Sequence, residues 1–123
     1  MVRGIRGATT ADDNDAAEIV SRTQELLRIL LSANGAKPEE IASAIFTVTD
    51  DLDAAFPAVA ARHLGGWENV PLLCAREIPV PGAPERCIRV LLHWNTELPA
   101  AAIQHAYLRG ARILRPEWAA DPQ

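Results

Sequence analysis

The stretch that decides the fold is VPLLCAREIPVPGAPERCIRVLLHW, residues 70–94. It contains two apolar runs, at 70–78 and 87–94, on either side of the proline-rich segment PVPGAP at 79–84. Two apolar runs around a segment rich in proline and glycine are typical of two strands joined by a stiff loop. We therefore expect a pair of strands here, around which the rest of the chain is organised.

The second run predicts one buried face and one charged face. Because side chains alternate between the two faces of a strand, one buried face should hold Ile88, Val90, Leu92 and Trp94. Arg89 then lies on the opposite face, where its guanidinium must meet solvent, a carboxylate or a ligand. In the first run, Cys74 and Glu77 are three residues apart, so strict alternation places them on opposite faces. These polar groups are the first candidates for function.

The composition predicts one intracellular domain. The chain has 123 residues, of which 49% are hydrophobic, enough for the core of a single domain. Its formal net charge of −4 argues against nonspecific binding to nucleic acids or membranes. No apolar run approaches the roughly 20 residues that span a bilayer, and the N-terminus lacks the apolar region of a signal peptide. Two cysteines are too few for a disulfide scaffold, so we expect a cytoplasmic location. The histidines and cysteines have no metal-ligand spacing.

The N-terminal half predicts alternating strands and helices. Residues 2–8 form a strand candidate, and the polar residues 9–14 a loop. The clearest helix runs over 15–34, with Asp15 as its N-cap and Glu18 placed as in a capping box. Further elements are expected in this order: a helical turn at 38–41, a strand at 44–49, an acidic turn at 50–53 and a helix at 56–64.

The C-terminal part predicts a third helix, an extended segment and a tail. Residues 100–108 are rich in alanine and favour a helix, residues 111–116 favour an extended segment, and 117–123 should be a flexible tail. The chain then forms one domain at 1–116. The fold class is α+β, with α/β as the alternative: a mixed β-sheet packed against two main helices. The helices cover one face of this sheet, so a symmetric oligomer is the simplest way to bury the other.

Several short motifs lie in order along the chain: RGIRGATT at 3–10, AFPA at 55–58, VP at 70–71 with Cys74 and Glu77, CIRV at 87–90, HAYL at 105–108 and LRP at 114–116. Together they resemble the monofunctional chorismate mutases of the AroH type. None of them is as specific as a phosphate-binding loop. Their shared order and spacing, over residues 2–116, make the resemblance strong.

The resemblance implies a homotrimer, a pseudo α/β-barrel of the chorismate mutase/RidA-like type with active sites between subunits. It also implies the isomerisation of chorismate to prephenate, in the biosynthesis of phenylalanine and tyrosine, with neither cofactor nor metal. The elements alone predict an exposed sheet face and an oligomer. The trimer and the substrate come only from the resemblance.

This reaction is a concerted Claisen rearrangement, which needs a compact substrate conformer and a positive charge at the ether oxygen. By the resemblance, Arg89 meets that oxygen, Arg6 and Tyr107 bind carboxylates, and Glu77 accepts a hydrogen bond from the ring hydroxyl. The residue types alone allow ordinary structural roles. Arg89 would be a surface arginine, Tyr107 a buried ring with a wet hydroxyl, and Glu77 a salt-bridge partner of Arg76 or Arg89.

The resemblance also implies a set of further substrate contacts and a lid. The cleft would be lined by Cys74, Phe56, Ala58, Arg62 and Leu73, and the C-terminal lid would contribute Leu114 and Arg115. Since Cys74 and Glu77 should lie on opposite faces, we expect one strand to serve two clefts of a trimer. Two residues depart from the family pattern: Leu73 stands where relatives often have threonine, and Val59 where some have lysine.

Two other functions fit some of these features. One is a RidA-like imine hydrolase, which also binds carboxylates between subunits through an arginine, although that family's overall sequence pattern is not found. The other is a non-catalytic trimer that binds carboxylate ligands. The presence of Arg6, Glu77, Arg89 and Tyr107 together speaks against it.

Overall fold

A five-stranded mixed sheet forms the centre of the fold. The computed structural model describes residues 1–121. The strands are β1 (Val2–Thr10), β2 (Ile41–Val48), β3 (Leu72–Arg76), β4 (Cys87–Asn95) and β5 (Ala106–Tyr107), and their order across the sheet is β3-β2-β4-β1-β5. β4 runs antiparallel to both β1 and β2, whereas β2–β3 and β1–β5 are parallel pairs. This mixed sheet with two α-helices confirms the expected α+β class.

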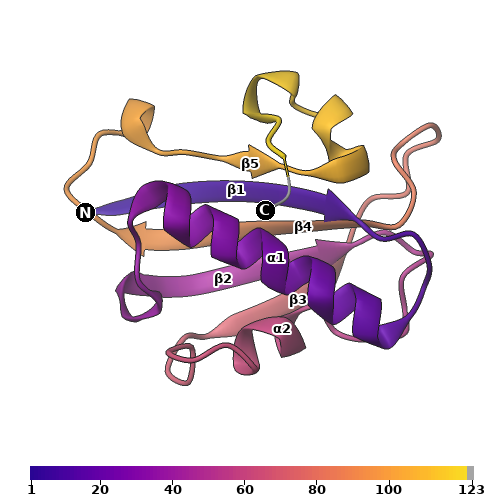
Figure 1. Cartoon of the computed structure of the whole chain (residues 1–123), viewed down its shortest axis with the longest axis horizontal. Coiled ribbons are helices and arrows are strands. Elements are labelled where there is room, and N and C mark those ends of the chain that lie inside the picture. Colours follow the sequence, from indigo (N-terminus) through magenta and orange to yellow (C-terminus); the bar gives the residue numbers. More distant parts are fainter. Residues whose placement is uncertain (122–123) are drawn as a thin grey trace.

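Helix α1 (Ala16–Asn34) covers one face of the sheet (Figure 1). Asp15 caps it by accepting a hydrogen bond from the Glu18 N–H, and Gly35 ends it with a φ of 64°. The Glu18 carboxylate accepts a hydrogen bond from the Asp12 N–H, so the capping box is not reciprocal. On β1, a Cβ at Gly7 would lie 2.7 Å from Leu30. The absence of a side chain there lets the helix approach the strand closely.

The predicted buried face of the 87–94 run is confirmed. Its alternate residues are at most 4% exposed: Ile88, Val90, Leu92 and Trp94. Val90, Leu92 and Trp94 share one core with Leu26, Leu27 and Leu30 of α1, and Ile88 packs in a neighbouring buried cluster with Ile19 of the same helix. Burial of this many large apolar side chains stabilises β4 along its whole length. Arg89 is therefore carried by a strand whose other face is anchored in the core.

The predicted pairing of the two strands within 70–94 is wrong. β3 and β4 both pair with β2, which lies between them. The chain leaves β2, passes through the short helix α2 (Ala58–Arg62) and returns as β3, parallel to β2. A parallel return puts β3 at the edge of the sheet, so the proline-rich connection must pass β2 before β4 begins.

The C-terminal elements also differ from the prediction. Residues 100–108 contain only a 3-10 turn at Ala100–Ala102 and the strand β5, and residues 109–113 form a second 3-10 turn where an extended segment was expected. The edge of β1 explains the strand, because its backbone groups need partners. The Leu108 N–H donates to the Ala8 carbonyl at 2.9 Å. This requirement outweighs the helix propensity of the alanines.

Smaller differences concern the ends of elements. β1 continues to Thr10, β2 begins at Ile41, and α2 ends at Arg62 rather than at residue 64. Of the expected tail, residues 122–123 lie outside the described residues, and its flexibility stays a prediction. Up to residue 121, the tail contacts β5: the Ala120 N–H donates to the Tyr107 carbonyl at 2.9 Å, and Ala119 forms a bridge with Tyr107.

The second face of the sheet remains largely open. Neither α-helix covers it, and apolar side chains from three strands are exposed there: Val2 (53%), Ile45 (36%) and Leu73 (62%). Near β5, the 3-10 turn at Arg109–Ile113 covers Ala8 and Tyr107 through Ala111. We call the uncovered part the open face. It carries Arg89 on β4 and Arg6 on β1.

Candidate active site

Four residues form a row across the side of the sheet that carries Arg89: Thr47 and Arg89 lie on the open face, and Ala8 and Tyr107 lie under the turn at 109–113. The strand register pairs Thr47 with Arg89, Arg89 with Ala8, and Ala8 with Tyr107. The backbones of four strands thus fix these side chains relative to one another. Ala8, between Arg89 and Tyr107 in this row, is fully buried against Tyr107 and Ala111. The sheet register itself therefore assembles groups that lie far apart in the sequence.

Arg89 meets a carboxylate on this face. Its Nε lies 3.5 Å from Oε2 of Glu77, and the two side chains are 25% and 23% exposed. Thr47 Oγ1 donates a hydrogen bond to the same Glu77 oxygen. Within residues 1–121, the buried Arg89 Nε has no hydrogen-bond partner, because the contact with Glu77 is an ion pair only. The guanidinium is held in place and still has donor capacity for a ligand.

Arg6 and Tyr107 flank this ion pair. The Arg6 guanidinium carbon lies 5.9 Å from the centre of the Tyr107 ring. Tyr107 is fully buried among Ala8, Cys87 and Ala111, and its hydroxyl has no hydrogen-bond partner in the described part of the chain. An unpaired buried hydroxyl costs free energy, so a ligand that reached it would regain a hydrogen bond. Burial raises the pKa of the neighbouring Cys87 thiol, which argues against a thiolate nucleophile.

A pocket of about 340 Å³ lies over the ion pair. Its lining combines two guanidinium groups, one carboxylate and apolar side chains: Arg6, Ile45, Thr47, Glu77, Arg89, Val90 and Leu91. Two cations around one carboxylate favour an anionic ligand, and guanidinium groups bind carboxylates through paired hydrogen bonds. Tyr107 is not part of this lining.

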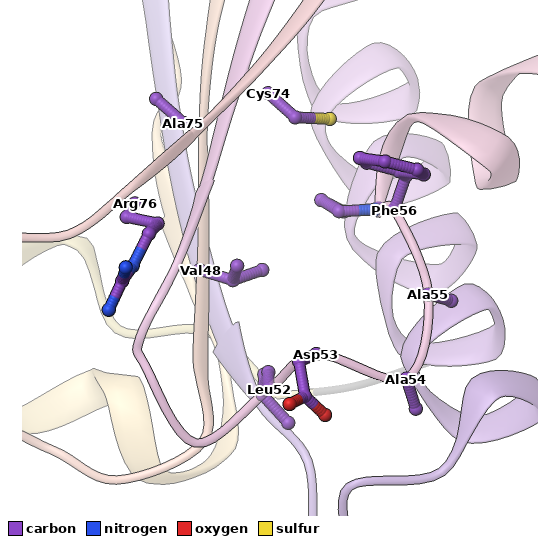
Figure 2. Close-up of a pocket in the computed structure, with 10 residues that line it drawn as sticks. Val48, Leu52, Asp53, Ala54, Ala55, Phe56, Cys74, Ala75 and Arg76 are labelled. Atoms are coloured by element: carbon purple, nitrogen blue, oxygen red, sulfur yellow. The ribbon is translucent and has the colours of Figure 1, made fainter.

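The predicted opposite orientation of Cys74 and Glu77 is confirmed. Cys74 pairs with Phe46, whose side chain is buried in the core, whereas Glu77 faces Thr47 on the open face. Cys74 lines a different pocket, of about 370 Å³, with Phe56 and the loop before α2. Figure 2 shows the Cys74 sulfur pointing toward Phe56. Phe56 is 70% exposed, so this pocket has an apolar and accessible rim.

The structure does not bring the other predicted cleft residues together within one chain. Ala58 is buried at the start of α2, and Arg62 lies in a separate hollow with Trp67 and Glu68. Leu73 follows the register of Ile45 and projects on the open face, opposite to Cys74. A single chain thus holds two incomplete sets of predicted contacts on different sides of β3.

The C-terminal segment packs onto the Tyr107 side of the site. Leu114 contacts the buried cluster around Tyr107. The Arg115 guanidinium lies 3.6 Å from the centre of the Trp118 ring and pairs with Glu117. At the start of the segment, Arg109 forms two hydrogen bonds of 3.1 Å with the Glu25 carboxylate of α1. The segment is therefore fixed to α1 at one end and to β5 at the other.

Sequence reasoning missed three residues of this region. The strand expected at 44–49 contains Thr47. Because alternate residues share a face, Thr47 lies with Ile45 on the face opposite to Phe46. The motif HAYL at 105–108 gives His105 no role of its own, and the tail expected at 117–123 includes Trp118. The residue type of Trp118 could have indicated packing against the domain, because burial of a large aromatic side chain is favourable in free energy.

Comparisons with known proteins identify the family. The family model for chorismate mutase type I matches residues 2–118. The chain is 54% identical to chorismate mutase AroH of Thermus thermophilus over 118 residues, which cover 95% of this chain and 96% of that protein. It is 42% identical to chorismate mutase AroH of Bacillus subtilis (strain 168) over 117 residues, covering 95% of this chain and 92% of that protein.

A solved structure agrees with these matches. A chorismate mutase from Clostridium thermocellum superimposes with a TM-score of 0.87 at 54% identity, covering 89% of this chain and 97% of that one. The chain belongs to the chorismate mutase type I family. The resemblance seen in the motifs is thereby confirmed, and the activity of this enzyme is that of a chorismate mutase, an isomerase of aromatic amino-acid biosynthesis. No helix within residues 1–121 is long and apolar enough to cross a membrane.

Proposed function

We propose that chorismate is rearranged to prephenate on the open face, with the Arg89 guanidinium at the breaking C–O bond. The observation that carries this proposal is the buried Arg89 Nε, which is fixed by β4 and Glu77 and still lacks a hydrogen-bond partner in the described residues. A preorganised donor of this kind stabilises charge that develops in the transition state without having to reorganise first.

The chemistry explains why no acid–base pair is required. The C–O bond to the enolpyruvyl group breaks while a new C–C bond forms, and electrons move in a closed cycle within one molecule. No proton leaves or enters, and no covalent intermediate forms. The enzyme therefore contributes by holding the compact conformer and by placing positive charge at the ether oxygen, which gains negative charge as its bond breaks.

The remaining polar groups are proposed to orient the substrate. Chorismate carries two carboxylates, and the pocket over the ion pair offers Arg6 in addition to Arg89. We assign Arg6 and the unpartnered Tyr107 hydroxyl to carboxylate binding, and Glu77 to the ring hydroxyl as a charged acceptor. Arg115 adds a cation from the C-terminal segment, and Leu114 holds that segment against the Tyr107 cluster.

We further propose that the site is completed by a neighbouring copy in a homotrimer. Two observations support this arrangement. The open face exposes apolar side chains, and the contacts expected in one cleft are divided between two pockets on different sides of β3. A second copy that brought Cys74, Phe56, Ala58 and Arg62 over the Arg89 pocket would supply the missing wall. Light scattering during gel filtration should give three times the chain mass; a monomer with full activity would exclude this arrangement.

The direct test of the proposed site uses chorismate and the purified protein. The diene absorbance of chorismate should disappear in the presence of enzyme, and prephenate should accumulate in equal amount. Binding of chorismate without its disappearance would instead support the non-catalytic ligand-binding alternative. We also propose a cytoplasmic location, which the free state of Cys74 and Cys87 supports.

A prediction concerns Thr47, which holds the Glu77 carboxylate. Thr47→Val keeps the shape of the side chain but removes the hydroxyl that donates to Glu77 Oε2. Because a hydrogen bond to a charged group contributes about 1.5–3 kcal/mol, we expect kcat/KM to fall by at least about tenfold. Thr47→Ser keeps the hydroxyl and is the matched control, with kcat/KM close to wild type. Equal activity of the two variants would show that Thr47 does not position Glu77.

A second prediction concerns Arg115. Arg115→Ala removes a cation from the C-terminal segment, so we expect KM for chorismate to rise by about 3- to 10-fold with a smaller change in kcat. Arg112→Ala is the matched control, because Arg112 pairs with Asp121 and is assigned no contact with the substrate. The measurement is the KM for chorismate of both variants, from steady-state kinetics. An unchanged KM in Arg115→Ala would argue against a role of this segment in substrate capture.

A further inference from the structure

His105 holds the backbone of Arg6 through its side chain. β5 pairs with β1 only at Gly7 and Ala8, so the neighbouring N–H of Arg6 has no strand partner on that side. The imidazole Nδ1 of His105 takes its place and accepts the Arg6 N–H at 3.0 Å. The chain thus extends the sheet pairing by one hydrogen bond, made by a side chain instead of a backbone carbonyl, at a residue that we assign to substrate binding.

The acceptor role fixes the protonation state of His105. A backbone N–H can only donate, so Nδ1 must carry a lone pair and the proton must sit on Nε2. A protonated imidazole has no acceptor and would lose this hydrogen bond. Burial lowers the pKa of His105, and the positive charges of Arg6 and Arg115 lower it further. The neutral form is therefore the one present at neutral pH.

The other side of the His105 ring carries the C-terminal segment. The Trp118 ring lies 4.1 Å from the His105 ring, centre to centre, at an angle of 42°. The Arg115 guanidinium packs on the Trp118 ring in turn, and the Trp118 ring also lies 5.7 Å from that of Tyr107. A continuous stack therefore connects the backbone of Arg6, through His105 and Trp118, to Arg115.

We propose that His105 is a positioning residue that sets Arg6 and the C-terminal segment together, and that protonation of its ring releases both. The proposal rests on the proposed function for the roles of Arg6 and Arg115 in binding chorismate. The structural part does not, because the hydrogen bond and the stack exist without substrate. His105 itself touches no reacting atom and acts through its neighbours.

The charges around His105 oppose protonation of its ring. The charged groups that face it are Arg6 from β1 and Arg115 from the C-terminal segment, and both repel a protonated ring. Glu117 is occupied by Arg115, and no ion pair of His105 with a carboxylate is found up to residue 121. The folded state therefore binds the proton less readily than the unfolded chain. The stability contributed by neutral His105 is present above about pH 6.5 and is lost as the pH falls below it.

The first experiment measures the structure without substrate. Hydrogen–deuterium exchange at the Arg6 amide is compared in wild type, His105→Asn and His105→Leu, as protection factors corrected for intrinsic exchange. Asparagine offers a non-titrating acceptor near the position of Nδ1, whereas leucine offers none. We expect similar protection in wild type and His105→Asn at neutral pH, and protection at least about tenfold lower in His105→Leu. Equal protection in all three proteins would overturn the proposal.

The pH dependence gives a second, independent readout. In wild type, the fluorescence of Trp118 should change below about pH 6.5 as the ring gains a proton, because protonated imidazole quenches a stacked indole. Trp118→Phe gives the signal of the other two tryptophans for subtraction. The transition should be absent in His105→Asn and present in His63→Asn, the matched histidine control. A transition that persists in His105→Asn would refute the assignment, even if His105→Leu does not fold.

Steady-state kinetics connect the structural role of His105 with the binding of chorismate. In His105→Leu we expect KM for chorismate to rise by about tenfold with a smaller change in kcat, because a misplaced Arg6 weakens binding. In wild type, protonation of His105 should raise KM at acidic pH. In His105→Asn we expect KM to stay within about threefold of the wild-type value at neutral pH and not to rise at acidic pH. A rise of KM at acidic pH in His105→Asn equal to that in wild type would overturn the pH-dependent part. If wild type failed to convert chorismate, the proposed function would be wrong, while amide exchange and fluorescence would still decide the role of His105.

Discussion

Arg89→Lys is expected to lower kcat by about 100- to 1,000-fold, the range found when one preorganised transition-state donor is removed. Lysine keeps the positive charge but is a flexible point charge without the planar fork of arginine. It cannot maintain the contact with Glu77 and present a second donor in a fixed direction. The loss should therefore fall on the chemical step rather than on binding.

The measurement is kcat at saturating chorismate, with circular dichroism as a test of folding. Arg3→Lys is the matched control, because Arg3 is likewise carried by a strand of the sheet, β1, but donates to the Leu98 carbonyl, away from the pocket over the ion pair. Its kcat should stay close to wild type. Near-normal turnover by a folded Arg89→Lys enzyme would remove Arg89 from the role at the ether oxygen.

Glu77→Ala is expected to lower kcat/KM by roughly 10- to 100-fold, equivalent to the 1.5–3 kcal/mol of one hydrogen bond to a charged group. Glu77 has two roles in the proposed site. It orients the Arg89 guanidinium, from which it is separated by 3.5 Å, and it accepts from the substrate hydroxyl. Its removal also leaves the half-buried Arg89 without a counter-charge, so the guanidinium gains freedom to move.

Two further variants separate these roles. Glu77→Gln keeps an oxygen acceptor and the side-chain volume, so it should retain more activity than Glu77→Ala. Glu85→Ala is the matched control, because Glu85 is exposed, lies in the same connection and pairs with Arg86, outside the pocket over the ion pair. We expect its kcat/KM to equal that of wild type. If Glu77→Ala and Glu85→Ala had equal activity, Glu77 would have no part in the reaction.

Local patterns predicted much of the fold. The alternation at Ile88, Val90, Leu92 and Trp94 gave the buried face of β4 and placed Arg89 opposite to it, because strand geometry allows no other arrangement once four large apolar residues alternate. The same parity separated Cys74 from Glu77. The helix predicted at 15–34 from the N-cap residue Asp15 is observed at Ala16–Asn34.

Long-range partners could not be predicted in the same way. The position of β2 between β3 and β4 depends on which strands pair, and no pattern within 70–94 records this. The alanines at 100–102 favour a helix locally, and only the unpaired edge of β1 explains why the chain becomes a strand at Ala106. Thr47 was missed because its partner Glu77 lies 30 residues further along the chain. The residue roles at the site came from family resemblance, which the family match supports without testing each role.

The pairing of β1 with β5 has a consequence for biosynthesis of the chain. Arg6 and His105 are separated by 99 positions, so β1 emerges from the ribosome long before its partner β5. Until then β1 exposes an unpaired edge, which is a template for association with other chains. Nascent chains stalled before residue 105 should therefore recruit chaperones strongly, and synthesis of β5 at Ala106–Tyr107 should end that dependence.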